Sequence, residues 1–232
     1  IFGYGDAPPS YSSLTNLVSN AGVVATDVTG VGTARGYLAA CTYGGDKGIF
    51  GYGGAVVSLT NLVSNSGVVA TDTTGVGTAR SWLAACEYGD DKAIFAYGQT
   101  GSPVSVSNLV SNSGVVATDV TGVGTAREQL AACGYGYDKG IFGYGDDDSS
   151  KVSMTNLVSN VGVVATDTTG VGTDREKLAA TQYGGDKGIF AYGLTSGGIV
   201  SMSNLVSNSG VVATDVTGVG TTRSGLTACS YN

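Results

Sequence analysis

A five-residue motif that recurs at a nearly constant spacing constrains the fold of this chain more than any other feature. The motif Asn-Leu-Val-Ser-Asn begins at Asn16, Asn61, Asn108, Asn156 and Asn204, so successive copies are 45, 47, 48 and 48 residues apart. In each copy it is followed by Gly-Val-Val-Ala-Thr-Asp and then by Thr-Gly-Val-Gly-Thr. A repeat of this length is one supersecondary unit that buries its apolar surface against its neighbours, so the chain consists of five similar units.

The two ends of the chain divide one unit between them. In the first four copies Asp-Lys leads into Ile-Phe-x-Tyr-Gly, but the fifth copy ends at Tyr231-Asn232 and the segment Ile-Phe-Gly-Tyr-Gly is found at residues 1–5. We therefore expect the last extended segment, residues 226–231, to lie beside residues 1–5 and to close a ring. In an open array of repeats, nothing would require the first and last segments of the chain to come from the same unit.

Each unit contains four short extended segments. In the second copy these are residues 80–88, 92–98, 104–112 and 114–120, which are rich in Val, Thr, Tyr, Ile and Phe and carry no helical apolar stripe. Four strands per unit at this period predict an all-β chain, with residues 1–232 forming one five-bladed β-propeller of four antiparallel strands per blade. The segment around Cys86 has the smallest side chains and is expected to be innermost, where the blades converge. The segments around Phe95, Asn108 and Val116 then follow outward.

Charge and composition exclude several classes of function. The chain has 11 Lys and Arg against 18 Asp and Glu, a formal net charge of −7. Because its few cations are scattered, neither a nucleic acid nor an anionic membrane surface is an expected partner. The absence of histidine removes the commonest general base and every His-containing metal site. We expect no enzyme activity, cofactor or metal, and a hydrolase or lyase using Asp and Tyr in the channel is the least favoured hypothesis.

The remaining composition fits a folded domain. Glycine contributes 39 residues and proline 3, which indicates many tight turns rather than a collagen or a proline-rich disordered chain. Hydrophobic residues make up 42% and charged residues 12%, which is too apolar for disorder. No apolar run approaches the roughly 20 residues that a membrane helix needs. We expect a monomer, and the sequence assigns no compartment.

Residues 79–98 resemble a kelch repeat. Ala79-Arg80, the small-residue strand 83–86, a short hairpin and the strand 94–98 are similar to the family's Pro-Arg, small-residue strand, hairpin and Ile-Tyr-x-x-Gly-Gly strand. The second Gly of that pattern is present only in Gly53-Gly54, and the family's Trp on the fourth strand is replaced by Thr or Val, as in Thr73. The resemblance extends over the whole chain and implies a propeller that binds proteins. The copper enzymes among the relatives use His ligands, so the resemblance does not imply that activity here.

The five copies can be compared with one another, and they differ in two stretches. One is the insert after Tyr-Gly, and the other is the pair of residues after the repeated Arg. In the predicted strand order the innermost strand starts where its hairpin partner ends, so both stretches should lie on one face of the disc. The candidate ligand-binding residues on this variable face are Tyr11, Tyr37, Trp82, Gln129, Lys177 and Asp147.

Two interpretations of the variable face remain open. In the first it binds a protein or a glycan, because recognition residues commonly lie on loops held by a rigid scaffold. The different residues at Tyr37, Trp82, Gln129 and Lys177 then favour one asymmetric partner over the five equal sugar sites of a lectin. In the second the chain is a repeat-amplified or engineered propeller without a specific ligand, and its exposed loops vary because they tolerate change.

The repeated cysteines and charges have structural interpretations. Equivalent positions in neighbouring sheets are about 10 Å apart, whereas the two Cα atoms of a disulfide lie within about 7 Å. We therefore expect four reduced, buried thiols, at Cys41, Cys86, Cys133 and Cys229.

The repeated Arg and Asp residues predict structural ion pairs, and the alternative is a ring of arginines at the channel mouth that attracts an anion. The run Asp146-Asp147-Asp148 lacks the spacing of a calcium loop and is expected to be a solvated acidic loop.

Overall fold

A computed structural model describes residues 1–54 and 56–230, and within them every regular element is a β-strand. The strands are β1 (Phe2–Ala7), β2 (Ser10–Asn16), β3 (Ala39–Tyr43), β4 (Lys47–Gly51), β5 (Thr60–Val63), β6 (Ala84–Tyr88), β7 (Lys92–Ala96), β8 (Ser107–Val110), β9 (Ala131–Tyr135), β10 (Lys139–Gly143), β11 (Thr155–Val158), β12 (Ala179–Tyr183), β13 (Lys187–Thr195) and β14 (Gly198–Val206). They form five antiparallel sheets: β1–β2, β3–β4–β5, β6–β7–β8, β9–β10–β11 and β12–β13–β14. The expectation of an all-β chain is confirmed.

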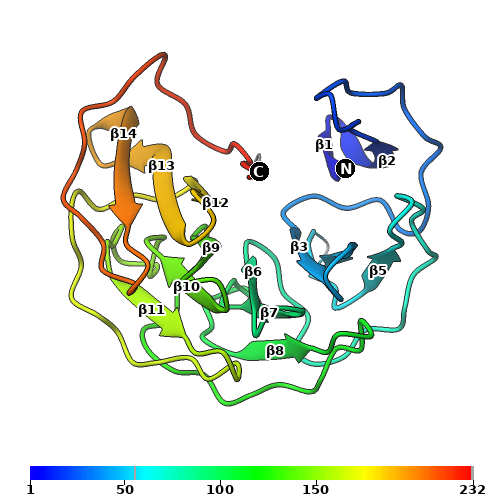
Figure 1. The fold of residues 1–232 in the computed structure, drawn as a ribbon, viewed down its shortest axis with the longest axis horizontal. Helices are drawn as coiled ribbons and strands as arrows, with labels where there is room; N and C mark the ends of the chain where they lie inside the picture. Colours follow the sequence, from blue (N-terminus) through cyan, green and yellow to red (C-terminus); the bar gives the residue numbers. More distant parts are fainter. Residues whose placement is uncertain (55, 231–232) are drawn as a thin grey trace.

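Strand order within each three-stranded sheet follows the expected sequence. The small-residue strands β3, β6, β9 and β12 lie nearest the centre, and the strands of the Asn-Leu-Val motif lie outside (Figure 1). Each inner hairpin turns through two successive residues with positive φ, such as Gly89 at 59° and Asp90 at 68°. Gly and Asp tolerate this conformation better than other residues, so the short linkers rich in Gly and Asp determine where the chain reverses.

The expectation of four strands per sheet is wrong. The outermost segment beside β5, for example, is attached to it by the isolated bridges Thr60↔Thr73 and Val63↔Val69 and by a few further backbone hydrogen bonds. Between these bridges the Asn61 side chain donates a hydrogen bond to the Ala70 carbonyl at 3.0 Å. A side-chain amide therefore holds the outer segment to its sheet along with the few backbone bonds, and a continuous fourth strand does not form.

The expected closure by residues 226–231 against residues 1–5 is not present. Within the described residues, 226–230 form no strand, β1 pairs only with β2, and residue 231 lies outside the described part. The five sheets form an arc that is open between β12–β14 and β1–β2 (Figure 1). Phe2 is 47% exposed, whereas Phe142 at the matching position is fully buried. The repeats predict that the edges at β12–β14 and β1–β2 are similar to the contacting edges inside the arc. They do not determine whether these two edges are in contact, because no short connection joins them.

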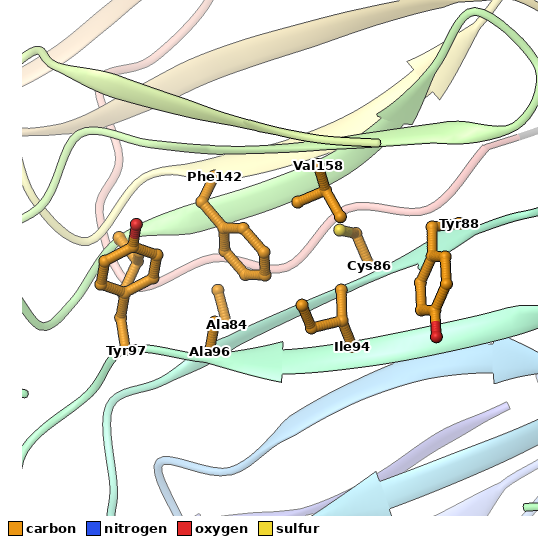
Figure 2. Packing of buried hydrophobic residues seen from close by; sticks show 9 residues of the cluster. Ala84, Cys86, Tyr88, Ile94, Ala96, Tyr97, Phe142 and Val158 are labelled. Carbon is orange, nitrogen blue, oxygen red and sulfur yellow. The ribbon is translucent and has the colours of Figure 1, made fainter. Parts of the chain in front are cut away.

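The hydrophobic core lies between successive sheets. Figure 2 shows Cys86 and Ile94 of one sheet packed with Phe142 and Val158 of the next. Ala84 and Ala96 take part in the same cluster, where small side chains allow the sheets to approach closely. Tyr97 and Phe142 place their ring centroids 5.5 Å apart at a tilt of 59°, a favourable aromatic geometry.

A buried arginine joins each pair of neighbouring sheets within the arc. Arg127 is fully buried, and its guanidinium carbon lies 4.3 Å from the centroid of the Tyr97 ring in the preceding sheet. It donates to the Tyr144 carbonyl at 2.9 Å and to the Asn156 side chain, and it lies 3.7 Å from Asp167. Arg35 and Arg175 form the corresponding ion pairs, which supports the structural interpretation of the repeated charges.

The cysteines are all free, as expected, but only part of the expected burial is observed. Cys86 and Cys133 are buried, Cys41 is half-buried and Cys229 is exposed. Burial raises the pKa of the Cys133 thiol to about 12. The exposure of Cys229 corrects the expectation of four buried thiols, and its cause is the missing contact between the last segment and β1.

Candidate functional site

The structure brings the two variable stretches together in the four units that are not divided between the chain ends. Isolated bridges join Ser81 to Gln99 and Glu128 to Asp146, each pair consisting of one residue after the repeated Arg and one after Tyr-Gly. Glu176 and Leu194 are paired in the same way. Because these pairs lie at the same end of their sheets, the variable residues share one face of the molecule. The hairpin turns lie at the opposite end.

A ladder of backbone hydrogen bonds connects the variable residues from sheet to sheet. The amide of Trp82 donates to the Tyr37 carbonyl at 2.9 Å, Gln129 donates to Trp82 at 2.9 Å, and Lys177 donates to Gln129 at 2.9 Å. The amide of Gly225 donates to Lys177 at 2.8 Å. The ladder gathers residues from five repeats into one cluster, which is the candidate functional site.

The residues of the ladder share an uncommon backbone conformation. Tyr37, Trp82, Gln129 and Lys177 have φ between 53° and 57°, the left-handed region that non-glycine residues seldom adopt. This conformation costs about 1 kcal/mol or more at each residue and persists only where the surroundings enforce it. The bonds of the ladder supply that constraint, so the directions of these four side chains are set by contacts between sheets.

Aromatic side chains form one part of the site. The Tyr37 and Trp82 rings are stacked, with centroids 3.9 Å apart and an interplanar angle of 18°. Tyr11 meets Tyr37 edge-on, with centroids 6.0 Å apart. A Cβ atom added to Gly54 would lie 2.9 Å from the Tyr11 ring, so this close approach of ring and backbone requires glycine. Tyr37 is 36% exposed, and the stack is therefore reachable from solvent.

Charged and polar side chains form the other part. The Lys177 ammonium lies 6.0 Å from the centroid of the Trp82 ring and 3.8 Å from the Glu176 carboxylate. The Gln129 amide nitrogen donates to Glu128 Oε1 at 3.0 Å. Among the described residues, Gln129 Oε1 and Glu128 Oε2 are buried and have no hydrogen-bond partner. An unsatisfied buried acceptor costs roughly 1–3 kcal/mol, so these two atoms would gain from a donor.

The environment of the site also perturbs two titrating groups. Burial raises the pKa of Glu128 above its ordinary value, and the nearby carboxylates of Asp146, Asp148 and Glu176 add to the increase, against the opposing hydrogen bond from Gln129. A hydrogen bond with the Asp6 carboxylate is the main cause that raises the pKa of the Tyr37 phenol. Neighbouring carboxylates thus contribute to both shifts, but the largest causes are burial for Glu128 and one hydrogen bond for Tyr37.

Asp147 differs from the other five predicted residues because its carboxylate is engaged in the loop. It accepts hydrogen bonds from the Ser149 amide at 3.0 Å, the Ser149 hydroxyl at 2.6 Å and the Ser150 amide at 2.8 Å. These bonds lower the pKa of Asp147, with the bond from Ser149 the largest cause and burial opposing it. The loop therefore uses Asp147 to shape its own backbone.

Two acidic residues of the site, Glu128 and Asp6, were not among the sequence candidates. Glu128 belongs to the variable pair after Arg127, so the comparison of copies contained a signal for it. Asp6 follows the first Tyr-Gly and had the same kind of signal. Their contacts with Gln129 and Tyr37 depend on tertiary structure and could not be predicted from the spacing of the repeats.

The remaining surface of the described residues has few distinct features. No group of three or more potential metal-ligating residues is found in residues 1–54 and 56–230. In the same ranges no helix is long and apolar enough to span a bilayer. Two shallow hollows of about 390 and 180 Å³ lie along the outer segments, one beside Ile199 and Val216 and the other beside Leu109 and Val163.

Comparison with protein-family models finds no match to this chain, and comparison with curated proteins finds none either. The function must therefore be argued from the geometry of the variable face.

Proposed function

We propose that the chain is a kelch-like five-bladed β-propeller that serves as a non-catalytic binding module. Its variable face would present the Tyr37–Trp82 stack and the surrounding side chains to a protein or a glycan partner. The single observation that carries the proposal is the solvent-reachable aromatic stack, assembled by a ladder that gathers the residues that differ between repeats. Aromatic residues at the centre of a surface commonly contribute most of the binding energy.

The alternative is a repeat-amplified scaffold with no specific ligand. It is supported by the near identity of the copies outside the two variable stretches. Against it, the residues that vary are gathered on one face, where two of them, Tyr37 and Trp82, form a stack.

The test of binding is a fluorescence titration of Trp82, the only tryptophan of the chain, against a glycan panel and fractionated proteins. We expect a saturable change with one ligand class and loss of direct binding in Trp82→Ala. The matched control is Tyr137→Ala, which removes a side chain that is 76% exposed in a hairpin turn at the opposite end of its sheet. Binding that survives Trp82→Ala, or fails equally in both variants, would contradict the proposal.

We also propose that the arc closes into a complete ring, and the composition of its two edges supports this. Between sheets inside the arc, Ile94 and Tyr97 pack against Leu130, Phe142 and Val158. The same residue types occupy the matching positions at the edges, namely Ile189 and Tyr192 on the last sheet and Phe2, Val18 and Leu226 in the unit that is divided between the two chain ends. Burying these side chains would contribute roughly 25 cal/mol for each Å² of apolar surface.

The polar residues at the edges are complementary too. Arg223 is exposed, and its guanidinium donates to the Tyr192 hydroxyl at 2.9 Å. On the other edge Asn16 donates to Asp27 at 2.8 Å, as Asn156 does to Asp167 inside the arc. Closure would bring Arg223 to Asn16 and Asp27, in the arrangement that Arg127 has inside the arc.

Thiol labelling tests closure without a mutation. The exposed Cys229 of the open arc would react with an aromatic disulfide reagent as fast as a free peptide thiol, whereas a closed ring would protect it. We expect slow labelling of Cys229 in native protein and rapid labelling of all four thiols in urea, with the modified peptides identified by mass spectrometry. Rapid labelling of Cys229 under native conditions would refute closure, and Cys229→Ser shows which signal belongs to it.

A further inference from the structure

We propose that the variable face binds a cationic side chain, arginine or lysine, presented by a partner protein. This inference rests on the proposed binding function and narrows its ligand class. The cation would lie beside Glu128 and Gln129, next to the Tyr37–Trp82 stack. Four observations bear on it: a comparison of two repeats, the chemistry of unsatisfied atoms, the contacts between cations and aromatic rings, and the distribution of charge between the two faces.

The third and fourth repeats differ at one decisive position. Glu176 is followed by Lys177, whose ammonium lies 3.8 Å from the Glu176 carboxylate, and Lys151 lies 3.4 Å from it on the other side. Glu128 occupies the equivalent position but is followed by Gln129, and among the described residues it makes no ion pair. At the position after the Glu, the fourth repeat therefore has a cation where the third repeat has a neutral amide, and both cations lie beside Glu176 rather than Glu128.

The unsatisfied atoms at this position are both acceptors. Glu128 Oε2 is a carboxylate oxygen and Gln129 Oε1 is an amide oxygen, and both are buried without a donor among the described residues. Guanidinium and ammonium groups only donate hydrogen bonds, so either group matches the two atoms. A guanidinium can also donate two parallel bonds, which fits two adjacent acceptors.

Aromatic rings in this protein accept cations repeatedly. Arginine guanidinium groups lie 4.3–4.6 Å from tyrosine centroids at five places between or beside the sheets. At the site itself the Lys177 ammonium lies 6.0 Å from the centroid of the Trp82 ring. Because Lys177 already lies beside the Trp82 ring and Tyr37 stacks on it, the acidic groups around Glu128, and not this ring, would select a second cation.

The two faces differ in charge balance. At the hairpin turns, each of four repeats pairs an Asp with the following Lys, with nitrogen to oxygen distances of 2.7–3.2 Å. On the variable face six acidic residues accompany two lysines, Lys151 and Lys177, and the acidic residues are Asp6, Glu128, Asp146, Asp147, Asp148 and Glu176. Such an excess steers a cationic partner toward the face and disfavours an anionic one.

The probe is a labelled hexapeptide with two central arginines, and its control is the same peptide with citrulline, which has nearly the same shape without the charge. We expect a saturable change of Trp82 fluorescence with the arginine peptide, at least about tenfold weaker binding of the citrulline peptide, and weaker binding at high salt. The variant Glu128→Gln should weaken binding by about tenfold, since it removes the charge but keeps the side-chain volume.

The sharpest variant is Gln129→Lys, which copies the fourth repeat into the third. It places an internal cation beside Glu128 at a ladder position where Lys177 already shows that lysine is compatible with the backbone. We expect the variant to fold with unchanged thermal stability or better and to bind the arginine peptide at least about tenfold more weakly. Undiminished binding by this folded variant would overturn the cationic inference.

The outcomes separate this inference from the function on which it rests. Equal binding of the arginine and citrulline peptides would overturn the cationic inference. Binding of a neutral glycan or an acidic peptide that is lost in Trp82→Ala would overturn it too, while leaving the proposed binding function standing. Failure of every peptide and glycan to give a signal dependent on Trp82 would overturn both.

Discussion

The buried arginine between neighbouring sheets offers the sharpest test of what holds the molecule together. We predict that Arg127→Met destabilises the protein strongly, although methionine fills much of the same volume. The guanidinium of Arg127 donates to the Tyr144 carbonyl, the Thr125 carbonyl and the Asn156 side chain, and it lies over the Tyr97 ring. Methionine replaces none of these donors.

The magnitude follows from what the substitution leaves behind. Asn156 is fully buried, and its side-chain oxygen would lose its donor. An unsatisfied buried acceptor costs roughly 1–3 kcal/mol, and the Tyr144 carbonyl would lose a bond as well. Asp167 would lose the cation that lies 3.7 Å away. Because the Asp167 side chain is 29% exposed, water can solvate the carboxylate that remains, and we expect a loss of about 2–4 kcal/mol that comes mainly from the two acceptors.

The assay is urea unfolding followed by circular dichroism and by Trp82 fluorescence, with the slopes of the two transitions compared to check that unfolding stays cooperative. Lys139→Met is the matched control, because it also removes a cation from an ion pair, but its side chain is 41% exposed and its partner is Asp138 at 2.8 Å. We expect this control to change stability far less. If Arg127→Met lost no more stability than Lys139→Met, the reasoning about the buried network would be refuted.

Two further predictions concern acid and glycine. Burial opposes the shift, but hydrogen bonds from the Asn156 and Thr125 side chains and the nearby Arg127 lower the pKa of Asp167 in the folded protein. Ionised Asp167 therefore stabilises the fold above the ordinary pKa of about 3.9, and this stabilisation is lost as the pH falls through the lower pKa of the folded state. Unfolding midpoints measured from neutral to acid pH should fall less steeply in Asp167→Asn, and an unchanged slope would contradict this. Gly145→Ala should cost about 2 kcal/mol or more in unfolding free energy, because φ is 105° and a Cβ would lie 2.6 Å from the Glu128 carbonyl. Gly134→Ala should cost much less, since its Cβ would meet only ordinary contacts from 3.6 Å and Glu87 already occupies the matching position, and equal losses would refute the argument.

Much of the fold could be predicted from the sequence because its causes are local or periodic. The spacing of Asn-Leu-Val-Ser-Asn predicts five similar units, and the small residues around Cys86 predict the innermost strand, as observed in β6. The short linker between Cys86 and Phe95 predicts their hairpin, and the register Ala85↔Phe95 is consistent with it. Each of these features depends on residues close together in the chain, where alternation and turn chemistry decide the conformation.

The candidate site could be predicted only as a set of positions. Comparison of the copies placed Tyr37, Trp82, Gln129 and Lys177 on one face, and the bridges between the variable stretches bear this out. It did not predict that Trp82 stacks on Tyr37, or that Glu128 is left without a cation. Those features depend on a left-handed backbone and on bonds between sheets.

The sequence by itself determined the number of units, the extended segments and their order, because these follow from periodicity and short connections. Tertiary structure alone decided that the outer segment is held by side chains such as Asn61, that Tyr37 stacks on Trp82, and that Glu128 and Gln129 are left with unsatisfied acceptors. The physical reason is that each of these depends on how one packed sheet is placed against another. Contacts between residues about 45 positions apart are selected by packing and hydrogen-bond satisfaction, which repeated local patterns do not encode.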